Sequence, residues 1–179
     1  GWKMPIYKEV HLETDYEFIL SQDYDKHYGS CIAHQVHELQ DIHDRFGGMP
    51  ETYTLMNTQI SQLWFEDGQL DYKDISKQLG IDIVSISAIR LKPGNTIPLH
   101  RDTFHKIKML HPDDERPRVR ANINLEKWKT GHIIQYDGKV ITGWKQGNGH
   151  LWDSSIEHLG ANCGMEPKYS LQVSGFLIN

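Results

Sequence analysis

Residues 98–102 read Pro-Leu-His-Arg-Asp, which places an imidazole and a carboxylate two positions apart. At the end of an extended strand, residues i and i+2 point to the same side. One ring nitrogen of His100 and one oxygen of Asp102 can then reach a single metal ion. A third ligand has to come from elsewhere, and the best candidate is His158, 58 residues further along the chain. Two histidines and one carboxylate on one face form the facial triad of non-haem Fe(II) oxygenases, which leaves positions open for a co-substrate and O₂.

The chain after Gly80 must supply the strands that carry these ligands. Short runs of β-type composition alternate there with turn residues, and Asp137-Gly138 predicts a tight hairpin. Strands are predicted over residues 81–91, 96–99, 119–125, 132–136, 139–141, 151–152 and 169–178. This series predicts a mainly β fold, a cupin-like jelly roll or double-stranded β-helix, with residues 81–179 as the catalytic core. Such a fold can bring a late strand carrying His158 beside the strand carrying His100.

Residues 1–80 have a different pattern, with apolar residues recurring at three- and four-residue steps. Three helices are predicted: residues 24–46, residues 55–65 with Thr54 as cap, and residues 72–79 between Asp71 as N-cap and Gly80 as a left-handed stop. We expect them to form an N-terminal helical layer on the core, within a single compact domain. On the first helix, His34 and His37 are interpreted as ordinary helix histidines.

A basic residue follows the third candidate ligand, His158, at a fixed spacing in the sequence. Lys168 comes ten residues after His158, and Ser170 follows two residues later. Together with the His-x-Asp pair, this run resembles the C-terminal half of the 2-oxoglutarate/Fe(II)-dependent oxygenase superfamily, whose members pair a basic residue at this spacing with the far carboxylate of 2-oxoglutarate. The resemblance implies that His100, Asp102 and His158 bind Fe(II), and that Lys168 and Ser170 hold the co-substrate. A lysine offers a point charge rather than the bidentate fork of the commoner arginine, so it would need the hydroxyl.

Within that superfamily, the chain is most similar to the aspartyl/asparaginyl β-hydroxylase-like group, which includes some free-proline hydroxylases. Residues 120–125 resemble its Arg-x-His-x-x-Leu strand, and residues 143–162 resemble its Trp-x-x-Gly and Asp-x-Ser-x-x-His-x-x-x-Asn pattern. The likeness spans roughly residues 90–175. Asn122 stands where the group often has histidine, and Asp102 supplies a ligand that the eukaryotic β-hydroxylases lack.

Two residues of the 120–125 strand are further candidates for ligand binding. Arg120 would serve as a fork for a carboxylate of substrate or 2-oxoglutarate, or else form a buried ion pair with an acidic side chain. The sequence leaves these alternatives open. Asn122 lies on the same face by alternation and is expected to hydrogen-bond the co-substrate. Trp144 and Trp152 are interpreted as packing residues of the barrel.

The implied function is an Fe(II)- and 2-oxoglutarate-dependent dioxygenase. It would use O₂ to hydroxylate an unactivated C–H bond of a small molecule, such as an amino acid, or of a peptide or protein side chain, with release of succinate and CO₂. The alternative is a cupin-type metalloenzyme that does not use 2-oxoglutarate, against which Lys168 argues. The nucleic-acid demethylases of the superfamily normally carry a second arginine after the co-substrate residue, and residues 168–179 contain none.

Composition limits the partners. The chain has 19 Lys and Arg residues and 24 Asp and Glu residues, which gives a net charge of −5 and argues against nucleic acid as a binding partner. No apolar run approaches the roughly 18 residues of a membrane helix, and residues 1–10 lack the apolar stretch of a secretory signal. With only two cysteines, far apart, a cytoplasmic location is expected. Residues 103–117 are predicted as an irregular stretch beside the metal. Residues 103–120 carry five basic against three acidic side chains, a locally basic patch that would suit a substrate bearing a carboxylate.

Overall fold

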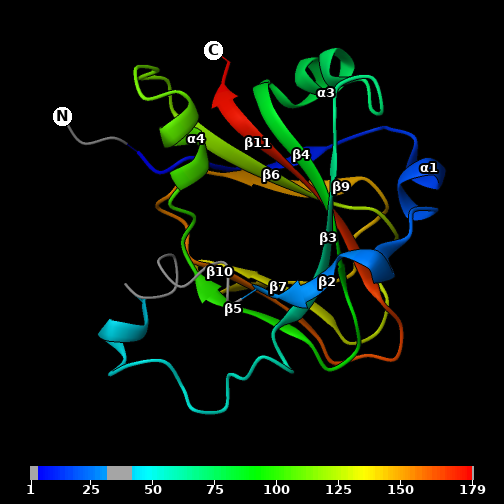
Figure 1. Cartoon of the computed structure of the whole chain (residues 1–179), viewed down its shortest axis with the longest axis vertical. Helices are drawn as coiled ribbons and strands as arrows, with labels where there is room; N and C mark the ends of the chain where they lie inside the picture. Colours follow the sequence, from blue (N-terminus) through cyan, green and yellow to red (C-terminus); the bar gives the residue numbers. More distant parts are fainter. Residues whose placement is uncertain (1–3, 32–41, 179) are drawn as a thin grey trace.

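The computed structural model describes residues 4–31 and 42–178 of the chain. Their fold is a double-stranded β-helix, or jelly roll, in which a large and a small antiparallel sheet face each other (Figure 1). The large sheet contains β1 (Tyr7–His11), β2 (Tyr28–Ser30), β3 (Gln59–Phe65), β4 (Ile81–Leu91), β6 (Arg118–Asn124), β9 (Asn148–Trp152) and β11 (Lys168–Leu177). The small sheet contains β5 (Thr96–His100), β7 (His132–Tyr136), β8 (Lys139–Ile141) and β10 (His158–Asn162).

The strand order shows how segments distant in sequence become neighbours. The large sheet runs β1-β9-β6-β11-β4-β3-β2, and the small sheet runs β5-β10-β7-β8. The helical segments are α1 (Tyr16–Leu20), the 3₁₀ helix η1 (Tyr24–His27), α3 (Tyr72–Leu79) and α4 (His105–Leu110). None of the helices in the described ranges has the length and apolar character needed to cross a bilayer.

The large sheet has one apolar and one polar face. Leu171 and Val173 of β11 pair with Ile123 and Ala121 of β6, and all four belong to the main core, which includes residues of α1 and α3. The alternate positions of the same strands are mostly polar and point to the small sheet: Arg120, Asn122, Asn124, Lys168, Ser170 and Ser174. Because buried polar groups are costly unless partnered, this inner face is suited to a lined cavity rather than to a dry sandwich core.

The predicted helix over residues 55–65 is wrong, because residues 59–65 form strand β3. Leu63 and Phe65 pack into the main core at period two, opposite Ala88 and Ile86 of β4. The apolar residues that suggested a helical face are therefore the core-facing side of a strand. Cross-strand pairing with β4, which local sequence cannot reveal, decides between the two.

The predicted helix over residues 24–46 is wrong at its start, where η1 is followed by the short strand β2. Residues 42–45 are helical. Residues 32–41, including His34 and His37, lie outside the described ranges. The helix predicted over residues 72–79 is confirmed as α3, with an Asp71 side chain that accepts from Asp74 N at 3.1 Å.

The N-terminal part of the chain is less helical than expected. Helices α1 and α3 do pack on the outer face of the large sheet, but residues 1–80 also supply β1, β2 and β3. The predicted hairpin is present, with left-handed backbone at Asp137 (φ 46°) and Gly138 (φ 82°) between β7 and β8. The irregular stretch predicted over residues 103–117 contains α4, whose Ile107 packs on Phe104 and Phe176.

Candidate metal centre

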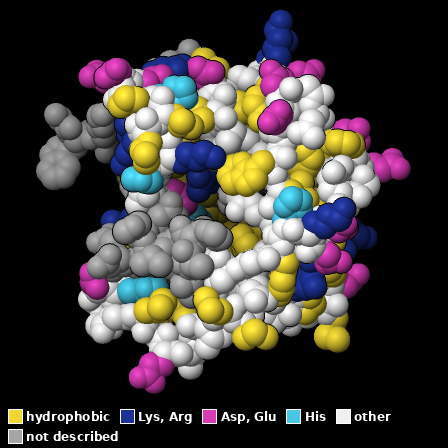
Figure 2. All heavy atoms as spheres, in the orientation of Figure 1, with side chains coloured by type: hydrophobic (Ala, Val, Ile, Leu, Met, Phe, Trp, Pro, Cys, Tyr) yellow, Lys and Arg dark blue, Asp and Glu magenta, His cyan; other side chains and the backbone are white. Residues whose placement is uncertain are grey.

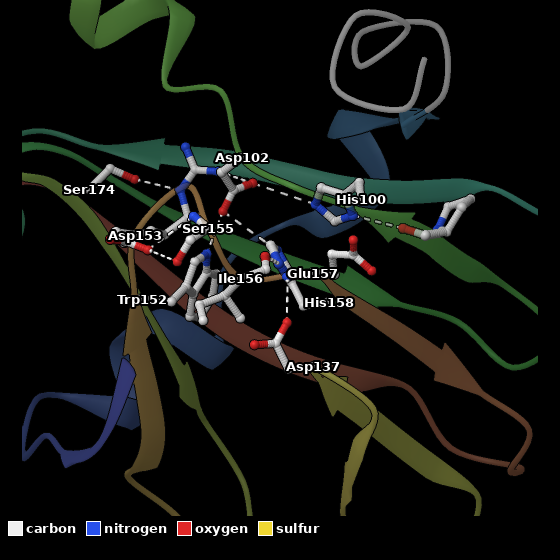
Figure 3. A network of polar contacts seen from close by, with 12 residues as sticks. His100, Asp102, Asp137, Trp152, Asp153, Ser155, Ile156, Glu157, His158 and Ser174 are labelled. Atoms are coloured by element: carbon white, nitrogen blue, oxygen red, sulfur yellow. Dashed lines mark hydrogen bonds and ion pairs between the residues drawn. The ribbon is translucent and has the colours of Figure 1, made fainter. Parts of the chain in front are cut away.

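Three buried side chains converge between the two sheets: His100, Asp102 and His158, referred to below as the metal group because they are the candidate metal ligands. His100 ends β5 and pairs in register with His158, which begins β10, while Asp102 follows β5 by two residues. The Nε2 atoms of His100 and His158 each lie 3.5 Å from an oxygen of Asp102, Oδ1 and Oδ2 respectively. Figure 3 shows the three side chains turned toward one another. Among the described residues this is the one group of three potential ligands whose donor atoms all lie within 4.8 Å of one another.

Backbone carbonyls fix which ring nitrogen of each histidine faces Asp102. Nδ1 of His100 lies 2.7 Å from the Pro98 carbonyl oxygen, and Nδ1 of His158 lies 3.0 Å from that of Ile156. Because a carbonyl only accepts, we assign the proton to Nδ1 in both rings, so that Nε2 carries the lone pair. Burial, with His100 as a further cause, lowers the pKa of His158 to about 4. The His158 ring is therefore neutral near pH 7, in the form that ligates metals.

Asp102 provides the anionic oxygen of the group and is 1% exposed. Burial by itself would raise its pKa, but the Arg120 guanidinium and the two histidines outweigh burial and hold the pKa well below its ordinary value. Arg120 Nη1 lies 3.0 Å from Oδ1, yet Oδ1 accepts no well-oriented hydrogen bond from the described residues. An ionised carboxylate and two imidazoles match the ligand set of a non-haem iron site.

Trp152 makes a contact that sequence reasoning missed. Its indole Nε1 donates to Oδ2 of Asp102 at 2.6 Å, while its ring packs with Ile134 and Tyr136 as the packing interpretation expected. Arg120 is also placed here, since its Nε donates to Ser174 Oγ at 2.8 Å while Nη1 faces Asp102. Arg120 of β6 lies opposite Trp152 of β9 in the strand register, which places both residues beside Asp102. This register is a feature of the tertiary structure and could not be predicted from local sequence.

An ion-pair network surrounds the ligand-bearing segments. Glu157, next to His158, accepts from Arg101 Nη2 at 2.8 Å, and Arg101 lies between His100 and Asp102 in sequence. Arg45 binds the same carboxylate with both terminal nitrogens, at 2.6 and 2.9 Å. The end of β5 and the start of β10 are thereby held together outside the metal group as well as within it.

Substitution of Trp152 by phenylalanine tests the hydrogen bond to Asp102. The variant keeps an aromatic ring in the cluster and removes the donor to Oδ2. We therefore expect metal affinity to fall roughly 10- to 100-fold, the usual loss when a residue that hydrogen-bonds to a metal ligand is removed. Anaerobic competition titration with Fe(II) measures the affinity. The matched control is Trp144→Phe, because Trp144 belongs to the same cluster without contacting Asp102. Equal losses in the two variants would assign the effect to packing.

Lys168 lies at the start of β11 and is buried without an anion. It is 7% exposed, and within the described part of the chain its Nζ has no ion pair; the Nζ lies 5.7 Å from the centre of the Trp144 ring. Burial lowers its pKa to about 8. Ser170 is on the same face by alternation. An uncompensated buried ammonium is costly, and an anionic ligand would supply the missing partner.

The other two predicted co-substrate residues lie further along the inner face. Arg120 pairs across from Ser174, six residues from Lys168, which is about 20 Å along an extended strand. The backbone positions of Arg120 and Lys168 therefore lie toward opposite ends of the inner face. Asn122 lies between them on the neighbouring strand, close enough to Tyr136 of β7 for a side-chain hydrogen bond.

A cavity of about 650 Å³ opens beside the metal group. Arg120 and Ser174 line it on the side of the metal group, and most of the remaining lining residues belong to α4, β2, β3 and β4. Figure 2 shows a hollow in this face, bordered by hydrophobic, basic and histidine side chains. The volume is in the range of sites for small molecules.

Comparison with known proteins supports the fold. No family model and no curated protein matches the sequence. Among solved structures, the α-ketoglutarate-dependent non-haem carbocyclase SnoK of nogalamycin biosynthesis matches with TM-score 0.54 and 8% identity, over 96% of this chain and 79% of that one. A Pseudomonas putida prolyl-4-hydroxylase matches with TM-score 0.51 and 17% identity, over 97% and 92%. At these identities the matches establish a shared fold and no more.

Proposed function

We propose that this chain is a non-haem Fe(II) and 2-oxoglutarate-dependent dioxygenase. The observation that carries the proposal is the buried convergence of two imidazole Nε2 lone pairs and the Asp102 carboxylate. The same inner face holds a buried ammonium, Lys168, that lacks an anion within the described residues. The shared fold with proteins named as a prolyl-4-hydroxylase and an α-ketoglutarate-dependent enzyme supports it.

Each residue has a defined role in this proposal. His100, Asp102 and His158 would hold the iron. Bound iron, with O₂ and 2-oxoglutarate, supplies the oxidising power that hydroxylates an unactivated C–H bond and releases succinate and CO₂. Lys168 and Ser170 would bind the far carboxylate of 2-oxoglutarate, with Asn122 as a further donor toward it. Trp152 and Arg120 would act as positioning residues, because both contact the Asp102 carboxylate directly.

The surroundings of the metal group favour chemistry that must exclude water. A buried apolar cluster includes Trp144, Trp152, Ile134 and Ile156. Its Trp152 ring packs against His158, and its Trp144 ring lies beneath the ammonium of Lys168. A dry site strengthens every electrostatic contact and limits side reactions. The substrate, a small molecule or a peptide side chain, would approach through the cavity lined by Arg120 and Ser174. The narrower likeness to the aspartyl/asparaginyl β-hydroxylase-like group rests on residues 120–125 and 143–162 and stays a prediction.

The proposal can be tested without knowing the substrate. Fe(II) is added to the metal-free chain under anaerobic conditions, 2-oxoglutarate is titrated in, and the visible charge-transfer absorption of the chelate is followed. We expect a saturable band, and none with succinate, which lacks the 2-oxo group needed for chelation. Iron binding without a band would instead favour the cupin-type metalloenzyme that does not use 2-oxoglutarate.

The pH dependence of co-substrate binding provides a second test. The pKa of Lys168 in the ligand-free chain is about 8, and only the protonated amine attracts a carboxylate. Affinity for 2-oxoglutarate should therefore be highest below that pKa and fall as the pH rises through it. Titrations at intervals from about pH 7 to 9 measure the trend. In the matched variant Lys168→Arg, whose guanidinium stays charged throughout, the affinity should not depend on pH in this range. A pH-independent wild type would contradict the assignment.

A further inference from the structure

The cavity beside the metal group has an unusual distribution of charge. Among the described residues that line it, four are basic or histidine, and none is acidic: His27, His105, Lys106 and Arg120. The whole chain carries a net charge of −5, with 24 acidic residues against 19 basic ones. Because the described part of the wall carries cations and no carboxylate, it attracts anions toward this cavity.

Lys106 is the cation in this wall that remains available to a ligand. Arg120 already faces the Asp102 carboxylate at 3.0 Å, so its charge is largely compensated. Lys106, on α4, forms no ion pair within the described ranges, and its Nζ lies 5.0 Å from the centre of the Trp64 ring. That contact holds the ammonium over the cavity rim without neutralising it, since an aromatic face stabilises a cation but carries no net charge.

The remainder of the wall is apolar and partly aromatic. Trp64 leaves 54% of its surface exposed although it lines the cavity, and Ile60 and Leu110 also contribute. Phe104 is buried at the inner side, under the guanidinium of Arg120 at 5.3 Å. Phe104 has a left-handed backbone, φ 53°, which is unusual for a residue with a large side chain. This conformation turns the chain after Asp102 so that α4 closes one side of the cavity.

We infer that the cavity binds a small-molecule substrate that joins an apolar body to a carboxylate. Lys106 would pair with the carboxylate at the outer end, the body would lie against Trp64 and Phe104, and the C–H bond to be oxidised would face the Asp102 end. The inference rests on the proposed function for the reaction, but the binding that it predicts does not require iron or 2-oxoglutarate. Lys106 and Trp64 act here as specificity residues.

The experiment compares a matched pair of probes, 3-phenylpropanoate and its neutral amide 3-phenylpropanamide. Saturation-transfer NMR on the full metal-free chain measures the dissociation constant of each. We expect the carboxylate to bind roughly two- to fivefold more tightly than the amide, the size of a partly exposed ion pair, and the difference to shrink with added salt. The variant Lys106→Gln should bind both probes alike. The control Lys108→Gln should keep the preference, because Lys108 is exposed on the same helix but does not line the cavity.

Each other outcome overturns the inference. Equal binding of the two probes by the wild-type chain, or no binding by carboxylates of several chain lengths, would remove the anionic substrate class. A preference that survives in Lys106→Gln would remove the assigned residue. Because the measurement uses metal-free protein, failure here leaves the 2-oxoglutarate titration untouched. Conversely, absence of the chelate band would defeat the proposed reaction while the charge preference of the cavity still stands or falls by the NMR result.

Discussion

Replacement of Asp102 by asparagine is expected to reduce metal-dependent turnover by more than about 100-fold. Loss of an outer partner costs about 10- to 100-fold in affinity or activity, and a direct ligand should cost more. Asparagine keeps the shape of the side chain and an oxygen for the Trp152 indole, but it removes the negative charge. Release of succinate from 2-oxoglutarate, measured at saturating Fe(II), gives the activity, and anaerobic titration gives the metal affinity.

The choice of asparagine rather than alanine follows from the contacts of Asp102. Alanine would leave the Arg120 guanidinium without its partner and open a hole under Trp152, so a loss of fold could be mistaken for a loss of metal. His100→Ala is the complementary variant, because it removes one Nε2 and leaves the contact between Asp102 and Arg120 in place. Far-UV circular dichroism and thermal unfolding verify the fold of both. Retained turnover in either variant would remove that residue from the triad.

Replacement of Lys168 should separate co-substrate binding from iron binding. We expect Lys168→Met to raise the 2-oxoglutarate concentration needed for half-saturation by roughly 30-fold or more, as when one partner of a buried charge pair is truncated. Iron affinity should change far less, because Lys168 is not among the candidate ligands. Parallel titrations of Fe(II) and 2-oxoglutarate measure the two effects. An unchanged 2-oxoglutarate requirement would move the anchor elsewhere, with Arg120 as the next candidate.

The same variant should stabilise the ligand-free protein. Burial lowers the pKa of Lys168 from 10.5 to about 8, which means that folding disfavours its charged form. The unfolded chain therefore binds the proton more tightly, the penalty is fully present below pH 8, and stability rises as the pH climbs from there toward the unfolded pKa. At neutral pH, Lys168→Met should increase the free energy of unfolding by on the order of 1 to 3 kcal/mol. Denaturant unfolding measures it, and destabilisation would show that Lys168 has a structural partner.

Much of the candidate site could be read from local sequence because its signals are local. The two-residue spacing of His100 and Asp102 sets them on one side of a strand end, and the alternation along β11 sets Lys168 and Ser170 on one face. The hairpin at Asp137 and Gly138 and the capped helix α3 follow from backbone preferences of a few adjacent residues. Each of these predictions depends on contacts within a few positions along the chain.

The errors arose where contacts between distant segments decide the conformation. Residues 59–65 have an apolar pattern compatible with a short helix, and pairing with β4 makes them a strand. Strands β1 and β2 are likewise stabilised by pairing with distant segments, β1 with β9 and β2 with β3. Short segments gain too little from local hydrogen bonds to fix their own structure, so burial against a neighbour selects it.

Local sequence was enough to predict the types of the candidate ligands, their spacing and the two-faced strands that carry them. The residues that support these ligands are brought to them by contacts between distant segments. The tertiary structure placed the Trp152 indole on Asp102 across 50 positions of sequence, and Arg120 between Asp102 and Ser174, 54 positions away. It also gathered the cavity wall from β2, β3, β4 and α4, and no described residue of that wall is acidic. The physical reason is that side-chain partners are set by strand order and register, which depend on the burial of whole faces rather than on any single segment.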